Sequence, residues 1–408
     1  MAEIYPFRGL RYTKKAGKLR DCVCPPYDII SDEERKALCD GNVFNLVRLE
    51  KPEGDDKYVT ARKTLDKWLE NGVLKADDEE SVYLYREEFT LSGKRYSFDG
   101  IVALCRLYDF SENVVLPHEE TLSKAKEDRF RLMLATRSSF SSIYSLYSDS
   151  DGRISAAVAA ARTGDPVSRF TDSEDVTHSL WKVSDPEAVN SICSAFAEKQ
   201  LFIADGHHRY ETALRYRDFT GYPEAESVLM TRVDMDSDGL IVLPTHRVVT
   251  ESRIGFAELK ELLKEDFEVT DGIPPEEAAE VLAARSESHA FVLYGGSDGA
   301  VLLVRKPRPV CDSPVKELDV SVLHDDILEK LLGIDKADMA AQKSLRYTRS
   351  AEEAISAVRS GNAAYAFIIN PTKVREIKAV AAAGEKMPQK STYFYLKLKT
   401  GLVMRKLF

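Results

Sequence analysis

The run from Asp205 to Arg209 reads Asp-Gly-His-His-Arg, which gathers in five positions the side chains that most often act on charged ligands. A short apolar run at 201–204 predicts a buried strand before it, and a helical pattern over 207–219 follows. Glycine between a strand and a helix permits a positive φ and a close approach to a ligand. Since the first amides of a helix have no partners inside it, they bind anions. The pattern therefore predicts an anion site on the amides after Gly206.

The side chains of this turn have the chemistry that such a site needs. Arg209 suits bidentate recognition of phosphate, and His207 adds a donor at the same place. Asp205 could hold a metal or take a proton, and His208 could act as an acid or a base. The alternative is structural: Asp205 caps the helix, and the histidines bond buried backbone groups.

A second pair of residues, His118 and Glu119, stands before a charged helical pattern at 123–137. A histidine beside a carboxylate can supply a general base or a metal ligand. A polar helix start, with acidic residues favoured by the helix dipole, is an equal alternative.

Two further segments could bind phosphate. His246 and Arg247 follow a proline in a segment that we expect to be a strand, and Lys390 precedes Ser391 in a polar stretch. A solvated edge strand and an ordinary loop are the alternatives. Four of the seven histidines fall in these segments, but their spacing matches no familiar zinc pattern such as His-Glu-x-x-His. Walker A, kinase glycine-rich, Rossmann and nucleophile-elbow patterns are absent from the sequence.

The elements that must position these residues alternate between helices and strands. Ser31 and Glu34 form a capping box at the start of a helix, and a helical pattern over 59–71 ends at Gly72. Two strands are expected within 81–108 around a turn at 92–94. Other expected elements are strands at 226–233, 240–249 and 363–369, helices at 256–267, 275–285, 318–333 and 350–360, and a hairpin of 291–294 with 300–304.

We therefore predict an α+β (mixed α/β) protein with a boundary near residue 253. Domain 1–253 carries the turn, and domain 254–408 is a smaller mixed α/β domain that contributes to the cleft.

Composition narrows the class of protein. The chain has 408 residues, 44% of them hydrophobic, and a formal net charge of -10, which argues against a nucleic-acid partner. We expect no membrane span and no signal peptide, because there is no apolar run of about 18 residues and the first residues are neither basic nor apolar. The six cysteines are scattered, so reduced thiols and a cytoplasmic location are expected.

Several segments together are familiar, and they occur in a fixed order along the chain. They are Pro6 to Tyr12, Pro25 to Ile30, Asn45 to Leu49, His118-Glu119, Lys126 to Arg129, Asp205 to Leu214, Leu243 to Arg247, and Pro388 to Tyr395. Over nearly its whole length the chain closely resembles the bacterial and archaeal domain of unknown function 1015 family, whose name implies no activity.

A more distant resemblance concerns the turn alone. Gly206 to Arg209 is similar to the phosphate-binding turn of the ParB and sulfiredoxin superfamily, which includes free-serine kinases. This resemblance implies a ParB/sulfiredoxin-like N-terminal domain and a nucleotide or phosphorylated ligand on the amides after Gly206. His207 stands where sulfiredoxins carry their reactive cysteine, which argues against sulfiredoxin chemistry.

The superfamily resemblance implies phosphoryl transfer on a small metabolite, by a free serine kinase or a phosphoserine phosphatase, with Mg²⁺ and ATP or ADP. Residues expected in catalysis are His118, Glu119, Asp205 and His208, with Asp205 and Glu119 as Mg²⁺ ligands. Residues expected to bind phosphate or ligand are Gly206, His207, Arg209, Arg8, His246, Arg247, Lys390 and Ser391. A nucleotide-sensing ParB-like regulator and a metal-dependent hydrolase are the alternatives, and a homodimer is left open.

Overall fold

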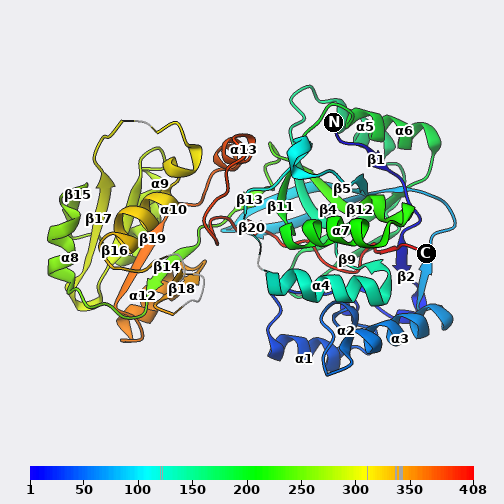
Figure 1. Cartoon of the computed structure of the whole chain (residues 1–408), viewed down its shortest axis with the longest axis horizontal. Coiled ribbons are helices and arrows are strands. Elements are labelled where there is room, and N and C mark those ends of the chain that lie inside the picture. Colours follow the sequence, from blue (N-terminus) through cyan, green and yellow to red (C-terminus); the bar gives the residue numbers. More distant parts are fainter. Residues whose placement is uncertain (120, 122, 310, 336–337, 340–342) are drawn as a thin grey trace. The chain divides into compact units, whose positions relative to one another are not determined.

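The computed structural model describes residues 1–119, 121, 123–309, 311–335, 338–339 and 343–408 as a mixed α/β protein of two compact units (Figure 1). Unit 1 consists of Met1–Pro117, Thr121–Ile241 and Leu396–Phe408, and unit 2 of His118–Glu120 and Val242–Tyr395. The predicted fold class is confirmed.

Unit 1 is built on a nine-stranded mixed sheet of order β6-β11-β8-β12-β5-β4-β10-β9, with β1 paired to β5. Two pairs, β11 with β6 and β12 with β8, are parallel, and the others are antiparallel. Its strands are β1 Ile4–Tyr5, β4 Val82–Leu91, β5 Lys94–Arg106, β6 Val115–Leu116, β8 Ile143–Tyr147, β9 Ser168–Thr171, β10 Thr177–Val183, β11 Leu201–Asp205 and β12 Ser227–Asp234. Two small sheets pair β2 Leu10–Tyr12 with β3 Leu74–Ala76, and β7 Ser138–Ser139 with β21 Arg405–Lys406.

Helices cover the sheet of unit 1 and bury its apolar strands. They are α1 Asp32–Gly41, α2 Val47–Glu50, α3 Lys57–Glu70, α4 Ser123–Thr136, α5 Arg153–Ala161, α6 Pro186–Ala195 and α7 His207–Thr220. One core joins α5, α6 and α7 to the central strands, and a second joins α2 and α3 to the N-terminal residues and Met404. α4 packs against both α7 and α3 (Figure 1).

Local sequence signals explain several of these elements. Ser31 and Glu34 form both hydrogen bonds of the predicted capping box at α1. The predicted hairpin is β4 and β5, and its turn places Ser92 and Gly93 at positive φ. Residues 101–105 of β5 are buried without alternation, which explains their continuous apolar run.

Unit 2 contains an antiparallel six-stranded sheet of order β15-β17-β16-β19-β14-β18. Its strands are β14 His246–Val249, β15 Phe267–Asp271, β16 Ala290–Tyr294, β17 Ala300–Arg305, β18 Leu345–Thr348 and β19 Tyr365–Ile369, with the separate pair β13 Ile241–Val242 and β20 Phe394–Tyr395. Its helices are α8 Phe256–Leu263, α9 Ala278–Ala283, α10 Asp319–Val322, the π-helical η8 Leu323–Glu329, α12 Ala351–Arg359 and α13 Val374–Ala382. The predicted hairpin of 291–294 with 300–304 is confirmed as β16 and β17.

Two sequence expectations differ from the structure of this unit. The helix expected over 256–267 ends at Leu263, because Phe267 starts β15 and pairs with β17. The strand expected over 240–249 is divided into β13 and β14 at Pro244, since proline lacks the amide that a sheet ladder needs.

The division into units also differs from the expected boundary at residue 253. β14 pairs with β18 and β19, so the second unit begins at Val242. The last thirteen residues return to unit 1, where the amide of Met404 bonds the carbonyl of Leu10 at 2.9 Å and Thr400 bonds Cys24 at 2.8 Å. A single boundary in the sequence cannot divide the chain correctly, because its C-terminal residues return to unit 1.

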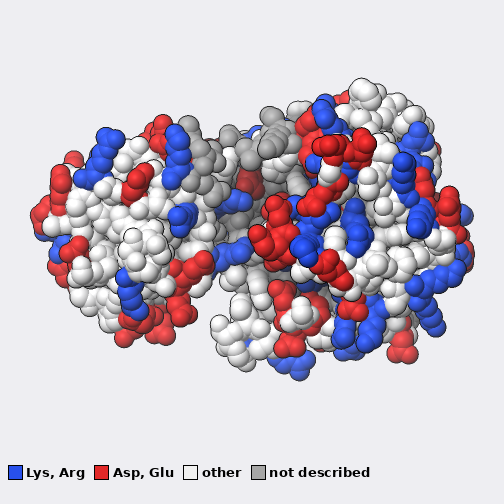
Figure 2. Space-filling view, turned by 90° about the horizontal axis from the view of Figure 1, so that it is seen from below, with Lys and Arg blue, Asp and Glu red and all other residues white. Residues whose placement is uncertain are grey.

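Charged residues of both signs are interspersed over the visible surface of the molecule (Figure 2). Within the described ranges, no helix is both long and apolar enough to cross a membrane.

Gly239 offers a test of the packing in unit 1. A Cβ at this position would lie 2.3 Å from the carbonyl oxygen of Ser97, which is backbone and cannot rotate away. We expect Gly239→Ala to lower the free energy of unfolding by roughly 1–3 kcal/mol in urea titrations, the range for overpacking. Gly41→Ala is the matched control, because nothing lies within 4 Å of its Cβ and alanine favours a helix end. Equal effects of the two changes would contradict this packing.

Candidate functional site

The predicted strand–glycine–helix turn is present at the end of β11. β11 ends at Asp205, Gly206 takes φ +95° and ψ +28°, and α7 begins at His207. A Cβ on Gly206 would lie 2.9 Å from Nε of Arg209, so the guanidinium group lies over the glycine. Glycine is therefore needed here both for its backbone conformation and for the space that Arg209 fills.

The side chain of Asp205 is largely buried, with 14% of it exposed, and its carboxylate is bound by two cations. Nζ of Lys397 lies 2.5 Å from one of its oxygens, and a terminal nitrogen of Arg209 lies 2.5 Å from the other. Burial alone would raise the pKa of Asp205, but Lys397 and Arg209 outweigh it and hold that pKa below its usual range. Arg209 also donates to the carbonyl of Ser142. The turn thus holds two cations beside the start of a helix.

His208 lies among charges of both signs on the same side of α7. Burial is the main cause that lowers its pKa, Lys126 and Arg209 act in the same direction, and Asp28 and Glu211 oppose them. Nζ of Lys126 lies 2.6 Å from Glu211, so these two charges largely compensate each other. His208 is therefore neutral near pH 7 and able to accept a proton.

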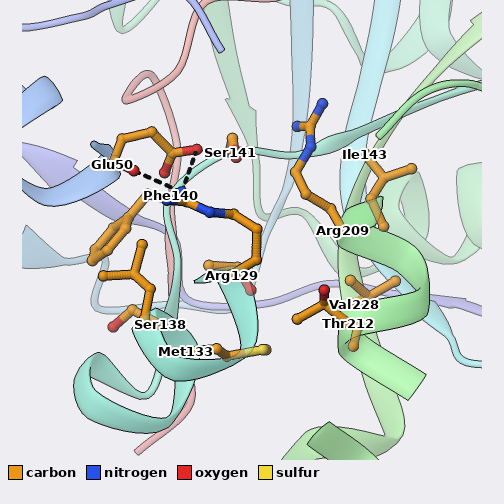
Figure 3. A pocket seen from close by; sticks show the side chains of 13 residues that line it. Glu50, Arg129, Met133, Ser138, Phe140, Ser141, Ile143, Arg209, Thr212 and Val228 are labelled. Carbon is orange, nitrogen blue, oxygen red and sulfur yellow. Dashed lines mark hydrogen bonds and ion pairs between the residues drawn. The ribbon is translucent and has the colours of Figure 1, made fainter. Parts of the chain in front are cut away.

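A cavity of about 50 Å³ lies beside the turn, and Figure 3 shows Glu50, Arg129 and Arg209 among its lining residues. A terminal nitrogen of Arg129 lies 2.6 Å from the carbonyl of Glu50, and the Arg129 guanidinium lies 4.0 Å from the ring centre of Tyr27. Oγ of Ser141 donates to the Glu50 carboxylate at 2.8 Å (Figure 3). A third cation is therefore held in the wall of this cavity.

A smaller cavity adjoins the turn and is lined by Asp205, Arg209 and Lys399, among others. Nζ of Lys399 lies 2.8 Å from Asp172, which in turn bonds the buried His178 at 3.1 Å. The C-terminal segment thus brings two lysines, at 397 and 399, to the walls around the turn.

His118 and Glu119, the next predicted site residues along the chain, lie in unit 2. Nε2 of His118 is 3.2 Å from Oγ1 of Thr392, and its ring meets Phe394 edge-on at 6.5 Å. Glu119 forms a backbone bridge with Met387. These contacts hold the 118–119 segment against the strand at the end of unit 2.

His246 and Arg247 are buried within unit 2. Nδ1 of His246 accepts from the amide of Ile369 at 3.2 Å, and burial, with Arg247 adding to it, lowers its pKa to about 4. Burial also lowers the pKa of Arg247 to about 10. Arg247 bonds His324 at 3.2 Å and the carbonyl of Lys390 at 3.3 Å. Both side chains therefore bond to other residues of unit 2.

Lys390 and Ser391 form a tight turn. Lys390 takes φ +59°, and Oγ of Ser391 donates to the carbonyl of Pro388 at 2.5 Å. Oγ1 of Thr372 donates to the carbonyl of Ser391 at 2.8 Å.

The predicted site residues therefore fall into two groups. Unit 1 holds the turn residues and Arg8, which is exposed. Unit 2 holds the remaining six, which are His118, Glu119, His246, Arg247, Lys390 and Ser391.

Sequence reasoning did not single out Glu50, Glu211, Lys397 or Lys399, although each contributes to the surroundings of the turn. Glu211 belongs to the Asp205 to Leu214 segment of the family resemblance and follows the turn on the same helix. Glu50, Lys397 and Lys399 stand in no recognisable pattern, and their proximity to the turn arises from long-range folding. Tyr27 did have a signal, because it belongs to one of the segments on which the family resemblance rests.

The arrangement of possible metal ligands is relevant to the predicted Mg²⁺ site. Among the described residues, no group of three or more His, Cys, Asp or Glu is placed to hold a metal ion. Both oxygens of Asp205 are bound by cations. A metal ion at Asp205 would therefore have to displace one of these cations and take most of its ligands from a bound molecule and from water.

Comparison with known proteins places the chain in a family. The model of the family described as a protein of unknown function (DUF1015) matches residues 4–321, and the chain belongs to this family. The family resemblance predicted from the ordered motifs is thus confirmed. A search of the curated proteins found no match.

Three similar solved structures are distant. A mutant free serine kinase in complex with ADP has 17% identity and a TM-score of 0.39, and the match covers 75% of this chain and 94% of that one. A conserved hypothetical protein from Pyrococcus furiosus has 16% identity and a TM-score of 0.37, with 74% and 94% covered. SbnI with a C-terminal truncation, from Staphylococcus aureus, has 12% identity and a TM-score of 0.37, with 74% and 87% covered. At these TM-scores the similarities carry no argument about the activity of this chain.

The pairing of Asp205 can be tested through Lys397. We expect Lys397→Met to lower the free energy of unfolding by roughly 3–5 kcal/mol at pH 7, because it leaves a buried carboxylate with one cation fewer. The loss should fade as the pH falls through the depressed pKa of Asp205, where protonation removes the charge. The measurement is a double-mutant cycle with Asp205→Asn in urea. Strictly additive effects would show that the two residues do not interact.

The lowered pKa of His246 predicts that unit 2 loses stability in acid. With a folded pKa of about 4 against an ordinary 6.5, only the unfolded chain gains this proton between those values. The contribution of His246 to stability is therefore complete above pH 6.5, and up to about 3 kcal/mol of it is lost as the pH falls to 4. His246→Asn keeps an acceptor for Ile369 and should flatten this dependence in denaturant titrations.

His289→Asn is the control for that experiment. His289 has a raised pKa because of its bond to Asp319, so its contribution has the opposite sign and is lost as the pH rises. An unchanged pH profile in His246→Asn would contradict the assignment.

Proposed function

We propose that the chain catalyses phosphoryl transfer to or from a small metabolite at the Asp205–Arg209 turn. The observation that carries the proposal is the pair of cations, Lys397 and Arg209, bound to Asp205 at the start of α7. Phosphoryl transfer depends mostly on positioning and on charge neutralisation, and this arrangement provides both.

A phosphate group would take the place of Asp205 as the partner of these cations. Arg209 lies over Gly206, beside the first amides of α7, so guanidinium and amides can bind the same oxygens. Lys397 adds a point charge from the C-terminal segment. The pairing with Asp205 keeps both cations close to the turn before the ligand arrives.

His208 and Asp205 are the proposed proton acceptors in unit 1. His208 is neutral near pH 7 because burial lowers its pKa, so it could accept the proton of an attacking hydroxyl group. Asp205, once its cations have moved to phosphate, could accept a proton or bind Mg²⁺. His118 and Glu119 stay predicted catalytic residues, and Arg8, His246, Arg247, Lys390 and Ser391 stay predicted ligand contacts.

The cofactors are those of phosphate chemistry. ATP or ADP is the proposed co-substrate, and Mg²⁺ would neutralise its phosphate oxygens. Asp205 is the residue of unit 1 that would hold Mg²⁺, in company with phosphate oxygens and water. Free serine or phosphoserine is the proposed metabolite, which rests on the resemblance of the turn to a superfamily that includes free-serine kinases.

A nucleotide-sensing regulator would use the same turn for binding without turnover, so the enzyme and the regulator differ in one measurement. A metal-dependent hydrolase needs converging donors, and the described residues supply no such group. The geometry therefore favours phosphate binding at the turn over a metal-dependent hydrolase, and turnover distinguishes the enzyme from the regulator.

Arg209→Ala tests the proposal directly. We expect ATP, ADP or phosphoserine at about 100 times its Kd, with Mg²⁺, to stabilise the wild-type chain by about 2.7 kcal/mol in thermal-shift assays. This stabilisation should be lost in Arg209→Ala, because the guanidinium no longer binds phosphate. Arg215→Ala is the matched control, since Arg215 is on the same helix but half-exposed and paired with Glu127.

A measurement of turnover distinguishes the enzyme from the nucleotide-sensing regulator. Formation of phosphoserine from serine and a nucleotide, or release of phosphate from phosphoserine, would support the enzyme. Nucleotide binding with neither reaction would favour the regulator. No stabilisation by any of these ligands would overturn phosphate binding at the turn.

A further inference from the structure

A second and larger cavity, of about 350 Å³, lies in unit 1 away from the turn. It is lined by β4, β5, α5 and the end of β12, and it shares no lining residue with the two cavities at the turn. Its volume is within the range of small-molecule sites, about 300–1,000 Å³. The proposed phosphoryl transfer uses none of its residues.

One wall of this cavity carries two guanidinium groups that share a single carboxylate. Arg86 bonds Asp99 in a bidentate manner, with both distances 2.8 Å, and a terminal nitrogen of Arg162 lies 2.6 Å from the same carboxylate. Nε of Arg162 is buried and has no hydrogen-bond acceptor among the described residues. The terminal nitrogen that lies near Asp99 is likewise buried and without a hydrogen bond among the described residues. This wall therefore has an excess of positive charge and a guanidinium group whose donors Asp99 does not fully satisfy.

The other charged residue of the cavity is Asp234, which is in the opposite situation. The ion pairs of the described chain give Asp234 no cation, and its acidic neighbours are Asp149 and Asp236. It accepts the amide of Asp236 at 3.3 Å. Burial, and then repulsion from Asp236 and Asp149, raise the pKa of Asp234. A cation bound beside it would relieve this repulsion.

Between these charges the lining is partly apolar and partly hydroxylic. Phe98, Ile101 and Val158 supply carbon surface, and Ser155 and Ser237 supply hydroxyl groups. A ligand that fits this lining has an anionic end, a cationic end and a small body. A simple anion would leave Asp234 without a cation, and a simple amine would leave the excess charge on Arg162 uncompensated.

We propose that this cavity binds a free α-amino acid, with its carboxylate on Arg162 and its ammonium group on Asp234. Arg86 holds Asp99 in place and thereby keeps Arg162 at the wall. The site is separate from the turn, so amino-acid binding here does not depend on phosphoryl transfer.

The test is isothermal titration calorimetry of the full chain with the twenty free amino acids. For each one that binds, the N-acetyl derivative removes the ammonium group and the amide removes the carboxylate. We expect each derivative to bind at least about tenfold more weakly than the free amino acid, a loss of about 1.4 kcal/mol. Arg162→Gln, which removes the guanidinium group, and Asp234→Asn, which keeps the side-chain shape and removes the charge, should each abolish or greatly weaken binding.

A second readout and a control keep the result interpretable. The Arg162 guanidinium lies 5.2 Å from the ring centre of Trp181, one of two tryptophans in the chain, so binding should change tryptophan fluorescence. Arg209→Ala should leave amino-acid binding intact while it removes nucleotide binding. The two proposals therefore fail independently of each other.

Three results would overturn the amino-acid site. One is no saturable binding of any amino acid, and another is equal binding of the N-acetyl derivative. The third is binding that survives in both Arg162→Gln and Asp234→Asn but is lost in Arg209→Ala, which would place the amino acid at the turn.

Discussion

The buried carboxylate of Asp205 is the constraint on which the rest of the site depends. An isolated buried charge is unstable by several kcal/mol, so Asp205 must keep Lys397 and Arg209 within ion-pair distance. Lys397 comes from the C-terminal segment, which therefore has to return to unit 1. Arg209 reaches Asp205 by lying over Gly206, where only a hydrogen side chain leaves room. One ion-pair network thus links the end of β11, the start of α7 and the C-terminal segment.

The same network explains how a stabilising arrangement can serve phosphate chemistry. Lys397 and Arg209 bind the carboxylate of Asp205 beside the start of α7, and a carboxylate has the negative charge and the oxygen atoms that a phosphate also offers. In the proposed function, a phosphate would replace Asp205 as the partner of these cations, and the freed carboxylate would then be available for a proton or for Mg²⁺. Arg129, Glu50 and Lys126 extend the charged surroundings along α4 and α2. The larger cavity differs from the turn, because its charged residues Arg162 and Asp234 are not paired with each other.

The sequence predicts the local features of this protein and misses the long-range ones. The capping box at Ser31, the β4–β5 hairpin and the Gly206 turn depend on a few adjacent residues, and all three are present. Lys397 and Glu50 escape prediction because their roles arise from folding over many residues. The boundary at 253 differs for the same reason, since the chain returns to its first unit. His246 and Arg247 lie in β14, which is buried between β19 and β18, so the solvated edge strand that was the alternative for them is wrong.

The most direct test of the central claim is the affinity for ADP of Asp205→Asn and of the wild-type chain, measured by calorimetry in EDTA. If Asp205 competes with phosphate for Arg209 and Lys397, removing its charge should tighten ADP binding several-fold in the absence of divalent ions. Circular dichroism of both proteins establishes that they are equally folded. ADP binding that is unchanged or weaker in a folded Asp205→Asn protein would contradict the account, because the two cations would then not be the phosphate ligands.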